Sequence, residues 1–121
     1  MVAVDPGLIA VDGSVVLDRV TKRYGQETVV AEVSVTIAPG EFFTLLGPSG
    51  SGKTTTLSML AGFVLADGGR VLLDGRDVTR APPRERGLGM VFQNYAIFPH
   101  LDVFENVAFP LRVRRASKPE V

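Results

Sequence analysis

The chain has 121 residues, 45% of them hydrophobic and 21% charged, which is typical of one globular domain and not of a disordered protein. Its 13 Lys and Arg residues balance its 13 Asp and Glu residues, so the net charge gives no reason to expect a nucleic-acid partner. The lack of cysteine excludes disulfides, thiolate metal sites and thiol redox chemistry, and no apolar run reaches the roughly 18 residues of a membrane span.

The N-terminal part of the sequence predicts a leader followed by two strands. Residues 1–13 do not form a secretory signal, because Asp5 and Pro6 interrupt them, and we interpret them as a loose leader. Residues 15–24 predict a first strand. Residues 31–38 alternate apolar and polar side chains, and this alternation favours an antiparallel strand with one face in water.

A strand and a helix are predicted next. Residues 41–46, which follow a Pro-Gly turn at 39–40, are aromatic and aliphatic, as in a strand buried on both faces. Residues 54–61 predict a helix that Gly62 is placed to end. The apolar face of this helix would consist of Leu57, Leu60 and Ala61.

Between this strand and this helix, residues 47–54 read G-P-S-G-S-G-K-T, a complete phosphate-binding motif. Its glycines let backbone N–H groups converge on phosphate oxygens, and the helix that follows adds the positive end of its dipole. Lys53 supplies a charge for the terminal phosphates and Thr54 a hydroxyl ligand for Mg²⁺. Thr55 is a further phosphate contact, or else a capping or packing residue. The predicted nucleotide contacts are Gly47, Pro48, Ser49, Gly50, Ser51, Gly52, Lys53, Thr54 and Thr55. The alternative, a flexible Gly-Ser loop, leaves the flanking strand and helix patterns unexplained.

Two more strands are predicted over residues 70–73 and 88–92. The first ends at Asp74, which resembles a Mg²⁺ ligand at a strand tip. However, Asp74 and Gly75 are also a hairpin turn pair, and residues 76–78 follow like a returning strand. We favour the turn.

A second helix is predicted over residues 102–115. Residues 102–105 have the D-x-x-E form of a capping box, and Pro110 is expected to end or kink the helix. The helical apolar stripe consists of Phe104, Val107, Ala108 and Leu111. The basic residues around the end of the chain are interpreted as a solvated terminus, not as a nucleic-acid site.

Taken together, four segments resemble the nucleotide-binding subunit of ATP-binding-cassette (ABC) transporters. They read V-T-K-R-Y-G, E-F-F-T-L-L-G-P-S-G-S-G-K-T-T-T-L, G-R-V-L-L-D-G-R-D-V and G-L-G-M-V-F-Q-N-Y-A-I-F-P-H-L. The last segment points to importers, and E-N-V-A-F-P-L-R-V-R is most similar to polyamine (spermidine/putrescine) importers, although those for iron, sugars or phosphonates are similar here. The resemblance implies an α/β P-loop NTPase of ABC type, with an N-terminal antiparallel β subdomain and the start of a parallel core sheet.

The resemblance also implies roles for residues outside the phosphate loop. Tyr24, by itself a core or rim residue, would stack on adenine. Gln93 would be the Q-loop glutamine, a catalytic residue that contacts Mg²⁺ and the attacking water. The segment from Asn94 to His100 would be the surface on which a membrane subunit docks. His100 does not correspond to the switch histidine of the family, and a docking or structural role is expected for it.

Several motifs of the family are not found in this sequence. It has no L-S-G-G-Q signature, no later strand ending in Asp-Glu and no switch histidine. We therefore interpret residues 14–121 as a partial nucleotide-binding domain truncated before the signature motif, whether naturally, deliberately or as a gene remnant. A strand at residues 41–46 without its neighbours predicts marginal stability or oligomerisation.

The leading functional hypothesis is an ATP-binding subunit that couples ATP binding and hydrolysis to solute uptake, in which this chain binds ATP and Mg²⁺ but lacks the hydrolytic residues. Its expected partners are membrane subunits and a second copy, with any solute-binding protein contacted indirectly and no nucleic acid. Its expected location is cytoplasmic, on the inner face of the cell membrane. One alternative is a non-catalytic fragment that docks a membrane subunit. Another is a small-molecule kinase, which the long stretch before the loop disfavours.

Overall fold

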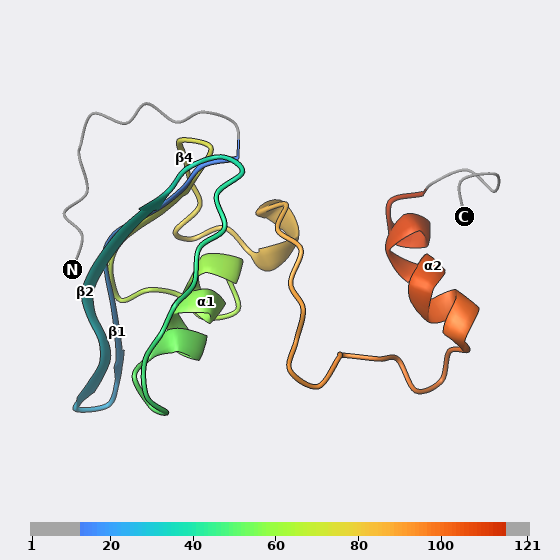
Figure 1. Cartoon of the computed structure of the whole chain (residues 1–121), viewed down its shortest axis with the longest axis horizontal. Coiled ribbons are helices and arrows are strands. Elements are labelled where there is room, and N and C mark those ends of the chain that lie inside the picture. The colour runs from blue at the N-terminus through green and yellow to red at the C-terminus, as the bar shows by residue number, and fades with distance from the viewer. Residues whose placement is uncertain (1–12, 116–121) are drawn as a thin grey trace. The chain divides into compact units, whose positions relative to one another are not determined.

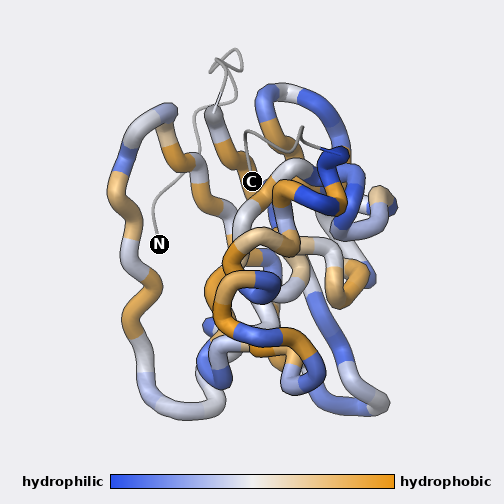
Figure 2. Tube along the Cα trace, turned by 90° about the vertical axis from the view of Figure 1, so that its right-hand side faces the viewer, coloured by the Kyte–Doolittle hydropathy of each residue, from blue (hydrophilic) through white to orange (hydrophobic). Residues whose placement is uncertain are grey.

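The computed structural model describes residues 13–115, which form two compact units, one ending at Leu88 and the other beginning at Gly89 (Figure 1). Of the predicted leader, residues 1–13, all but Gly13 lie outside the described residues. Within the described range no helix is long and apolar enough to cross a membrane, and the apolar stretches are short and broken by polar residues (Figure 2).

The first unit is built on a four-stranded antiparallel sheet. Strands β1 (Val15–Tyr24), β2 (Glu27–Ile37), β3 (Gly68–Leu73) and β4 (Arg76–Asp77) lie in the order β2-β1-β3-β4. The strands predicted at residues 15–24, 31–38 and 70–73 are confirmed, although β2 and β3 begin earlier than their sequence patterns. The register of β1 against β2 and β3 determines which side chains enter the core.

The turn between β3 and β4 confirms the interpretation of Asp74 and Gly75 as a hairpin pair. Their φ angles are 51° and 71°, the two positive values that a two-residue turn between antiparallel strands requires. The Asp74 carboxylate accepts a hydrogen bond from Gly13 N, and Asp74 N donates to Ser14 O at 3.0 Å. Asp74 is therefore a turn residue that also ties down the start of β1.

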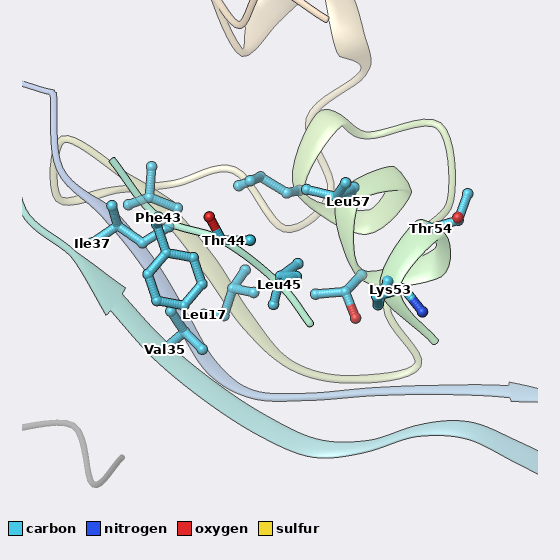
Figure 3. Close-up of a pocket in the computed structure, with 12 residues that line it drawn as sticks. Leu17, Val35, Ile37, Phe43, Thr44, Leu45, Lys53, Thr54 and Leu57 are labelled. Carbon is cyan, nitrogen blue, oxygen red and sulfur yellow. The ribbon is translucent and has the colours of Figure 1, made fainter. Parts of the chain in front are cut away.

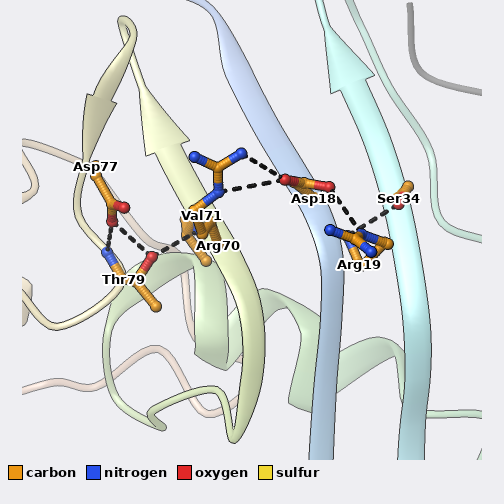
Figure 4. A network of polar contacts seen from close by, with 7 residues as sticks. All are labelled: Asp18, Arg19, Ser34, Arg70, Val71, Asp77 and Thr79. Atoms are coloured by element: carbon orange, nitrogen blue, oxygen red, sulfur yellow. Dashed lines mark hydrogen bonds and ion pairs between the residues drawn. The ribbon is translucent and has the colours of Figure 1, made fainter. Parts of the chain in front are cut away.

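Two irregular positions twist β1 against β2. Arg19 and Glu32 have φ angles of 49° and 48°, where the register of the pairing shifts. Hydroxyl groups replace the ladder acceptors there: Arg19 N donates to Ser34 Oγ at 2.9 Å (Figure 4), and Glu32 N donates to Thr21 Oγ1 at 3.2 Å. The bulges thus leave both amides satisfied.

Helix α1 (Lys53–Ala61) packs on the sheet and closes the core of the first unit. Met59 of the helix and Val20 and Val71 of the sheet are the centre of this core, with exposed fractions of 1%, 0% and 1%. Gly62 ends the helix in the left-handed conformation, with its N–H donating to Met59 O at 3.3 Å. The predicted helix and its glycine terminus are confirmed.

Two predicted strands are wrong. Residues 41–46 and 88–92 are irregular, and none of the described strands pairs in parallel. Phe42, Leu46 and Val91 are exposed by 94%, 89% and 91%. A strand forms only where a neighbour takes up its N–H and C=O groups, and the described chain provides no neighbour at these positions. The expected start of a parallel core sheet is therefore not formed among the described residues.

The second unit contains helix α2 (Val103–Val113), which follows an irregular segment. Glu105 N donates to Asp102 Oδ1 at 2.8 Å, so the predicted N-terminal cap is confirmed. Pro110 was expected to end or kink the helix; it lies inside the helix, which continues to Val113, so it does not end it. A proline removes one N–H donor from the helix, and here that loss does not stop it.

Candidate functional site

The phosphate-binding motif forms a loop directly against strand β2. Gly50 and Gly52 have φ angles of 80° and 86°, which favour glycine. A Cβ atom at Gly52 would lie 2.8 Å from Val29 O, so the loop is close to the β2 backbone. A hollow of about 290 Å³ is bounded by Val29 and residues 49–55. The loop therefore packs directly on the backbone of the β1–β2 hairpin.

Lys53 lies with its side chain over this loop. Its ammonium donates to Gly47 O at 2.8 Å, to Pro48 O at 2.6 Å and to Ser51 Oγ at 3.0 Å. A Cβ atom at Gly47 would lie 2.6 Å from Ser51 Oγ, so a larger residue there would disturb these contacts. The charge is held by loop oxygens that phosphate oxygens could replace as partners of the ammonium.

The N-terminal end of α1 is open to an anion. The hydrogen bond from Thr56 N to Gly52 O, at 2.8 Å, is the first of the helix, and no side chain caps the terminus. The amides of residues 53–55 therefore have no partner within the helix and lie at the positive end of its dipole. This arrangement fits a phosphate group.

The threonines at the start of α1 differ in accessibility. Thr54 is exposed and Thr55 is half-buried, whereas Thr56 is buried and its hydroxyl donates to Gly52 O at 2.8 Å. Within residues 13–115, no three His, Asp or Glu side chains gather where they could hold a metal ion. The exposed Thr54 hydroxyl is an oxygen of the kind that Mg²⁺ accepts as a ligand.

Tyr24 lies at the end of β1 that is nearest the phosphate loop. Its side chain is half exposed, at 51%. Lys22, two residues before it, pairs with Val30 of β2, and Val30 is adjacent to the Val29 carbonyl that Gly52 approaches. The structure therefore brings Tyr24 and the loop to the same end of the first unit.

Lys22 and Asp67 support Tyr24, and the sequence patterns did not identify either of them. Lys22 Nζ lies 5.3 Å from the centre of the Tyr24 ring and donates to Asp67 Oδ1 at 3.1 Å. Arg23 N donates to the other Asp67 oxygen at 2.8 Å. The hydrogen bond from Arg23 N, and to a smaller extent the one from Lys22, holds the pKa of the Asp67 carboxyl below its ordinary value. One face of the Tyr24 ring is thus occupied by a cation.

Gln93 belongs to the second unit, whereas the phosphate loop and Tyr24 belong to the first. It is exposed and begins the turn over residues 93–96, in which Tyr95 and Ala96 have positive φ angles of 63° and 50°. The first unit by itself therefore contains the phosphate loop, Lys53, Thr54 and Tyr24, but not Gln93.

Exposed apolar residues follow Gln93. Tyr95 and Ile97 are exposed by 79% and 65%, and a hollow of about 530 Å³ lies between this segment and α2. The Phe98 ring packs at 4.4 Å from the Phe109 ring and at 6.0 Å, edge on, from the His100 ring. The expected docking surface over residues 94–100 is thus an exposed apolar segment anchored at Phe98.

Asn106 holds this segment on α2, and sequence patterns gave no sign of its role. Its Oδ1 accepts from Phe98 N at 2.9 Å. Its Nδ2 donates to Phe98 O at 3.2 Å, Leu101 O at 3.0 Å and Asp102 O at 2.9 Å. One side-chain amide therefore fixes the loop before the helix.

A second, larger hollow in the first unit is apolar and does not suit phosphate. It has a volume of about 410 Å³ and lies between the sheet and α1, with Lys53 and Thr54 at its border (Figure 3). Residues 43–45, which are not part of a strand, line one side of it. The apolar side chains around it include Leu17, Val35, Ile37, Phe43, Leu45 and Leu57.

The glycine loop, its lysine and the open helix terminus have the arrangement that is typical of the P-loop class of nucleotide-binding proteins. A family model described as "ABC transporter" matches residues 30–120, and the chain belongs to this family. The expected family and the ABC-type fold class are therefore confirmed.

The relatives are proteins named "Spermidine/putrescine import ATP-binding protein PotA". The chain is 52% identical over 105 residues to the one from Nitrosomonas eutropha, covering 87% of this chain and 29% of that protein. It is 48% identical over 111 residues to the one from Thermotoga maritima, covering 92% and 30%. A crystal structure of the ADP conformation of an ATP-binding cassette of an ABC transporter has a TM-score of 0.58 and 32% identity, over 59% of this chain and 28% of that one. The chain thus spans less than a third of the length of these proteins.

Proposed function

We propose that this chain provides the ATP-phosphate and Mg²⁺ site of the nucleotide-binding subunit of an ABC importer. The observation that carries the proposal is the loop over residues 47–54, which leads into an uncapped helix with Lys53 folded over it. Family membership supports ATP as the nucleotide. The names of the relatives support import, with a polyamine-like solute.

Each residue of the site has a role that its chemistry suits. When nucleotide binds, the Lys53 ammonium would replace its hydrogen bonds to the loop carbonyls with hydrogen bonds to a terminal phosphate. The amides at the start of α1 would donate to phosphate oxygens. Thr54 would place its hydroxyl on Mg²⁺, and Thr55 would add a phosphate contact. Bound Mg²⁺ would neutralise part of the charge on the phosphates. Tyr24 would offer the adenine base the ring face that Lys22 does not cover.

Hydrolysis and its coupling to transport are proposed for the longer protein. Gln93 would contribute there by contacting Mg²⁺ and the attacking water. For the 121-residue chain we propose nucleotide binding with little turnover, since its sequence contains neither the signature motif nor the Asp-Glu pair that the resemblance implies. ATPase activity of the purified chain that depends on Lys53 would contradict this part of the proposal.

The partners are part of the same proposal. The exposed segment over residues 94–100 would contact a membrane subunit, supported by the exposure of Tyr95 and Ile97. A second nucleotide-binding subunit would close over the nucleotide. Together these contacts would place the protein in the cytoplasm, on the inner face of the membrane. The same exposed segment also supports the alternative of a non-catalytic, partner-binding fragment.

Titration of the chain with a fluorescent ATP analogue, with and without Mg²⁺, tests the proposal. Lys53→Ala should weaken binding at least about tenfold, because a hydrogen bond between charged groups contributes about 1.5–3 kcal/mol. Thr54→Ala should reduce the dependence of affinity on Mg²⁺. Arg84→Ala is the control, since its side chain is 80% exposed and pairs with Glu85.

Two results would separate the hypotheses. If Lys53→Ala and the unaltered chain bind the ATP analogue with equal affinity, the phosphate loop does not bind the nucleotide. No nucleotide binding at all, with capture of a transporter membrane subunit unaffected by Lys53→Ala, would favour the non-catalytic alternative.

A further inference from the structure

Arg86 is a buried cation to which the proposed function assigns no role. It is 4% exposed, and its burial lowers the pKa of the guanidinium, which nevertheless stays protonated because an arginine pKa begins so high. Within residues 13–115, the acceptors of its hydrogen bonds are backbone carbonyls and not carboxylates. Nη1 donates to Met59 O at 2.7 Å and Leu60 O at 2.9 Å, Nε donates to Ala81 O at 2.9 Å, and Nη2 donates to Thr79 O at 3.3 Å.

Two of these acceptors belong to the last turn of α1. This helix begins at Lys53 in the phosphate loop, so its two ends are about 13 Å apart at 1.5 Å per residue. A cation at its C-terminal end interacts favourably with the negative end of the helix dipole. Gly62 makes the approach possible, because a Cβ atom there would lie 2.5 Å from Arg86 Nε.

The other acceptors belong to the segment that follows β4. Thr79 in this segment is fixed to the sheet, since its Oγ1 accepts from Val71 N at 2.9 Å and donates to Asp77 Oδ1 at 2.6 Å (Figure 4). Arg86 itself comes shortly before Gln93 in the sequence. The Arg86 guanidinium therefore links the C-terminal end of α1 to the segment that leads to Gln93.

We propose that Arg86 is a positioning residue that couples the phosphate site to residues 89–100. The inference rests on the proposed nucleotide binding. A short helix moves as a rigid body, so a phosphate that shifts α1 at Lys53 also shifts the carbonyls of Met59 and Leu60, and Arg86 with them. The planar five-donor fork of arginine can hold several acceptors at once, whereas a lysine ammonium is a single point of attachment.

Hydrogen exchange of the 121-residue chain, with and without the Mg²⁺ complex of ATP, tests this coupling. In the unaltered chain, nucleotide should change the exchange rate of residues 89–100. Arg86→Lys should reduce that nucleotide-dependent difference in exchange rate at least about twofold. The same variant should change the affinity for nucleotide by a smaller factor. Gly62→Ala, which keeps Arg86 but blocks its approach to α1, should have the same effect, and Arg84→Lys, the exposed neighbour, should have none.

A purely structural role of Arg86 would give a different result. It would raise exchange throughout the first unit in both states and leave the nucleotide-dependent difference in residues 89–100 unchanged, which would overturn the inference. If Arg86→Lys fails to fold, as judged by exchange in the β1–β2 hairpin, Gly62→Ala decides. Nucleotide binding without any response in residues 89–100 of the unaltered chain would overturn the inference alone, whereas no binding would overturn the proposed function as well.

Discussion

The N-cap of helix α1 is Gly52, which places no side chain on the free amides, whereas the N-cap of α2 is Asp102, whose carboxylate accepts from Glu105 N at 2.8 Å. The two helices also differ in how they are held. Met59 of α1 is buried in the core of the first unit, while Val107 of α2 is 75% exposed. Helix α1 is stabilised by packing and its N-terminus is free for a ligand, while α2 is stabilised by its own cap and neighbouring loop.

This difference shows where the binding energy of a phosphate can act. An uncapped terminus is costly unless something else fixes the helix, and in the first unit the core and Arg86 do so at the opposite end. In α2 the side chains of Asp102 and Asn106 occupy the terminus and the loop before it. The positive end of α1 therefore remains available to an anion.

The largest expected effect compares a buried side chain of α1 with an exposed side chain of α2. Met59→Ala should lower the free energy of unfolding by about 2–5 kcal/mol, because it leaves a cavity in the core. Val107→Ala should change it by less than about 0.5 kcal/mol, because that side chain is exposed. Urea unfolding followed by circular dichroism measures both. Similar values for the two variants would show that the helices are held in the same way.

The next effect concerns the loop at the start of α1. Gly52→Ala should cost about 1–3 kcal/mol beyond Gly50→Ala, because its Cβ would meet Val29 O at 2.8 Å, whereas nothing lies within 4 Å of a Cβ at Gly50. Both variants share the cost of a positive φ, about 1–2 kcal/mol. Urea unfolding of the pair measures the difference, and equal losses would mean that the contact with β2 does not restrict the loop.

A smaller effect concerns the cap of α2. Asp102→Ala should destabilise α2 by about 1 kcal/mol, seen as faster amide exchange in residues 103–106 without a change in α1. Asp102→Asn is the matched control, because an asparagine side chain can also accept the hydrogen bond from Glu105 N. If both variants behave alike, the cap does not stabilise the helix as proposed.

The smallest effect is the pH dependence of the first unit. The Arg70 hydrogen bond holds the pKa of the Asp18 carboxyl below its ordinary value of 3.8, and Thr79 does the same for Asp77 (Figure 4). A lowered folded pKa gives stability that is present above the unfolded value and is lost as pH falls through the folded one.

Urea unfolding from about pH 7 down to about pH 2 measures this loss. Asp18→Asn should reduce the decline at acid pH by at most about 1 kcal/mol, since the Arg70 side chain is 61% exposed. Glu27→Gln, an exposed carboxylate on the same sheet, is the control. An unchanged acid decline in Asp18→Asn would assign the pH dependence to other groups.

Several elements of both units could be predicted because their signals are local. The alternation in β2, the Asp74-Gly75 turn, the glycine after α1 and the D-x-x-E cap each depend on a few adjacent residues. Residues 41–46 and 88–92 have the composition of strands, but the prediction was wrong because strand formation depends on partners that are distant in sequence. Of the two effects expected of Pro110, an end of the helix is not seen, since one lost hydrogen bond does not outweigh the rest of a helix.

The sequence by itself determined which groups the phosphate loop presents, because the glycines, Lys53 and Thr54 lie within one short motif, residues 47–54. Only the tertiary structure decided which groups surround that loop. The Val29 carbonyl lies against Gly52, Asp67 binds Lys22, and Arg86 binds carbonyls in the last turn of α1, and each of these contacts joins residues that are distant along the chain. Hydrogen bonds and packing depend on proximity in space, which local patterns do not encode.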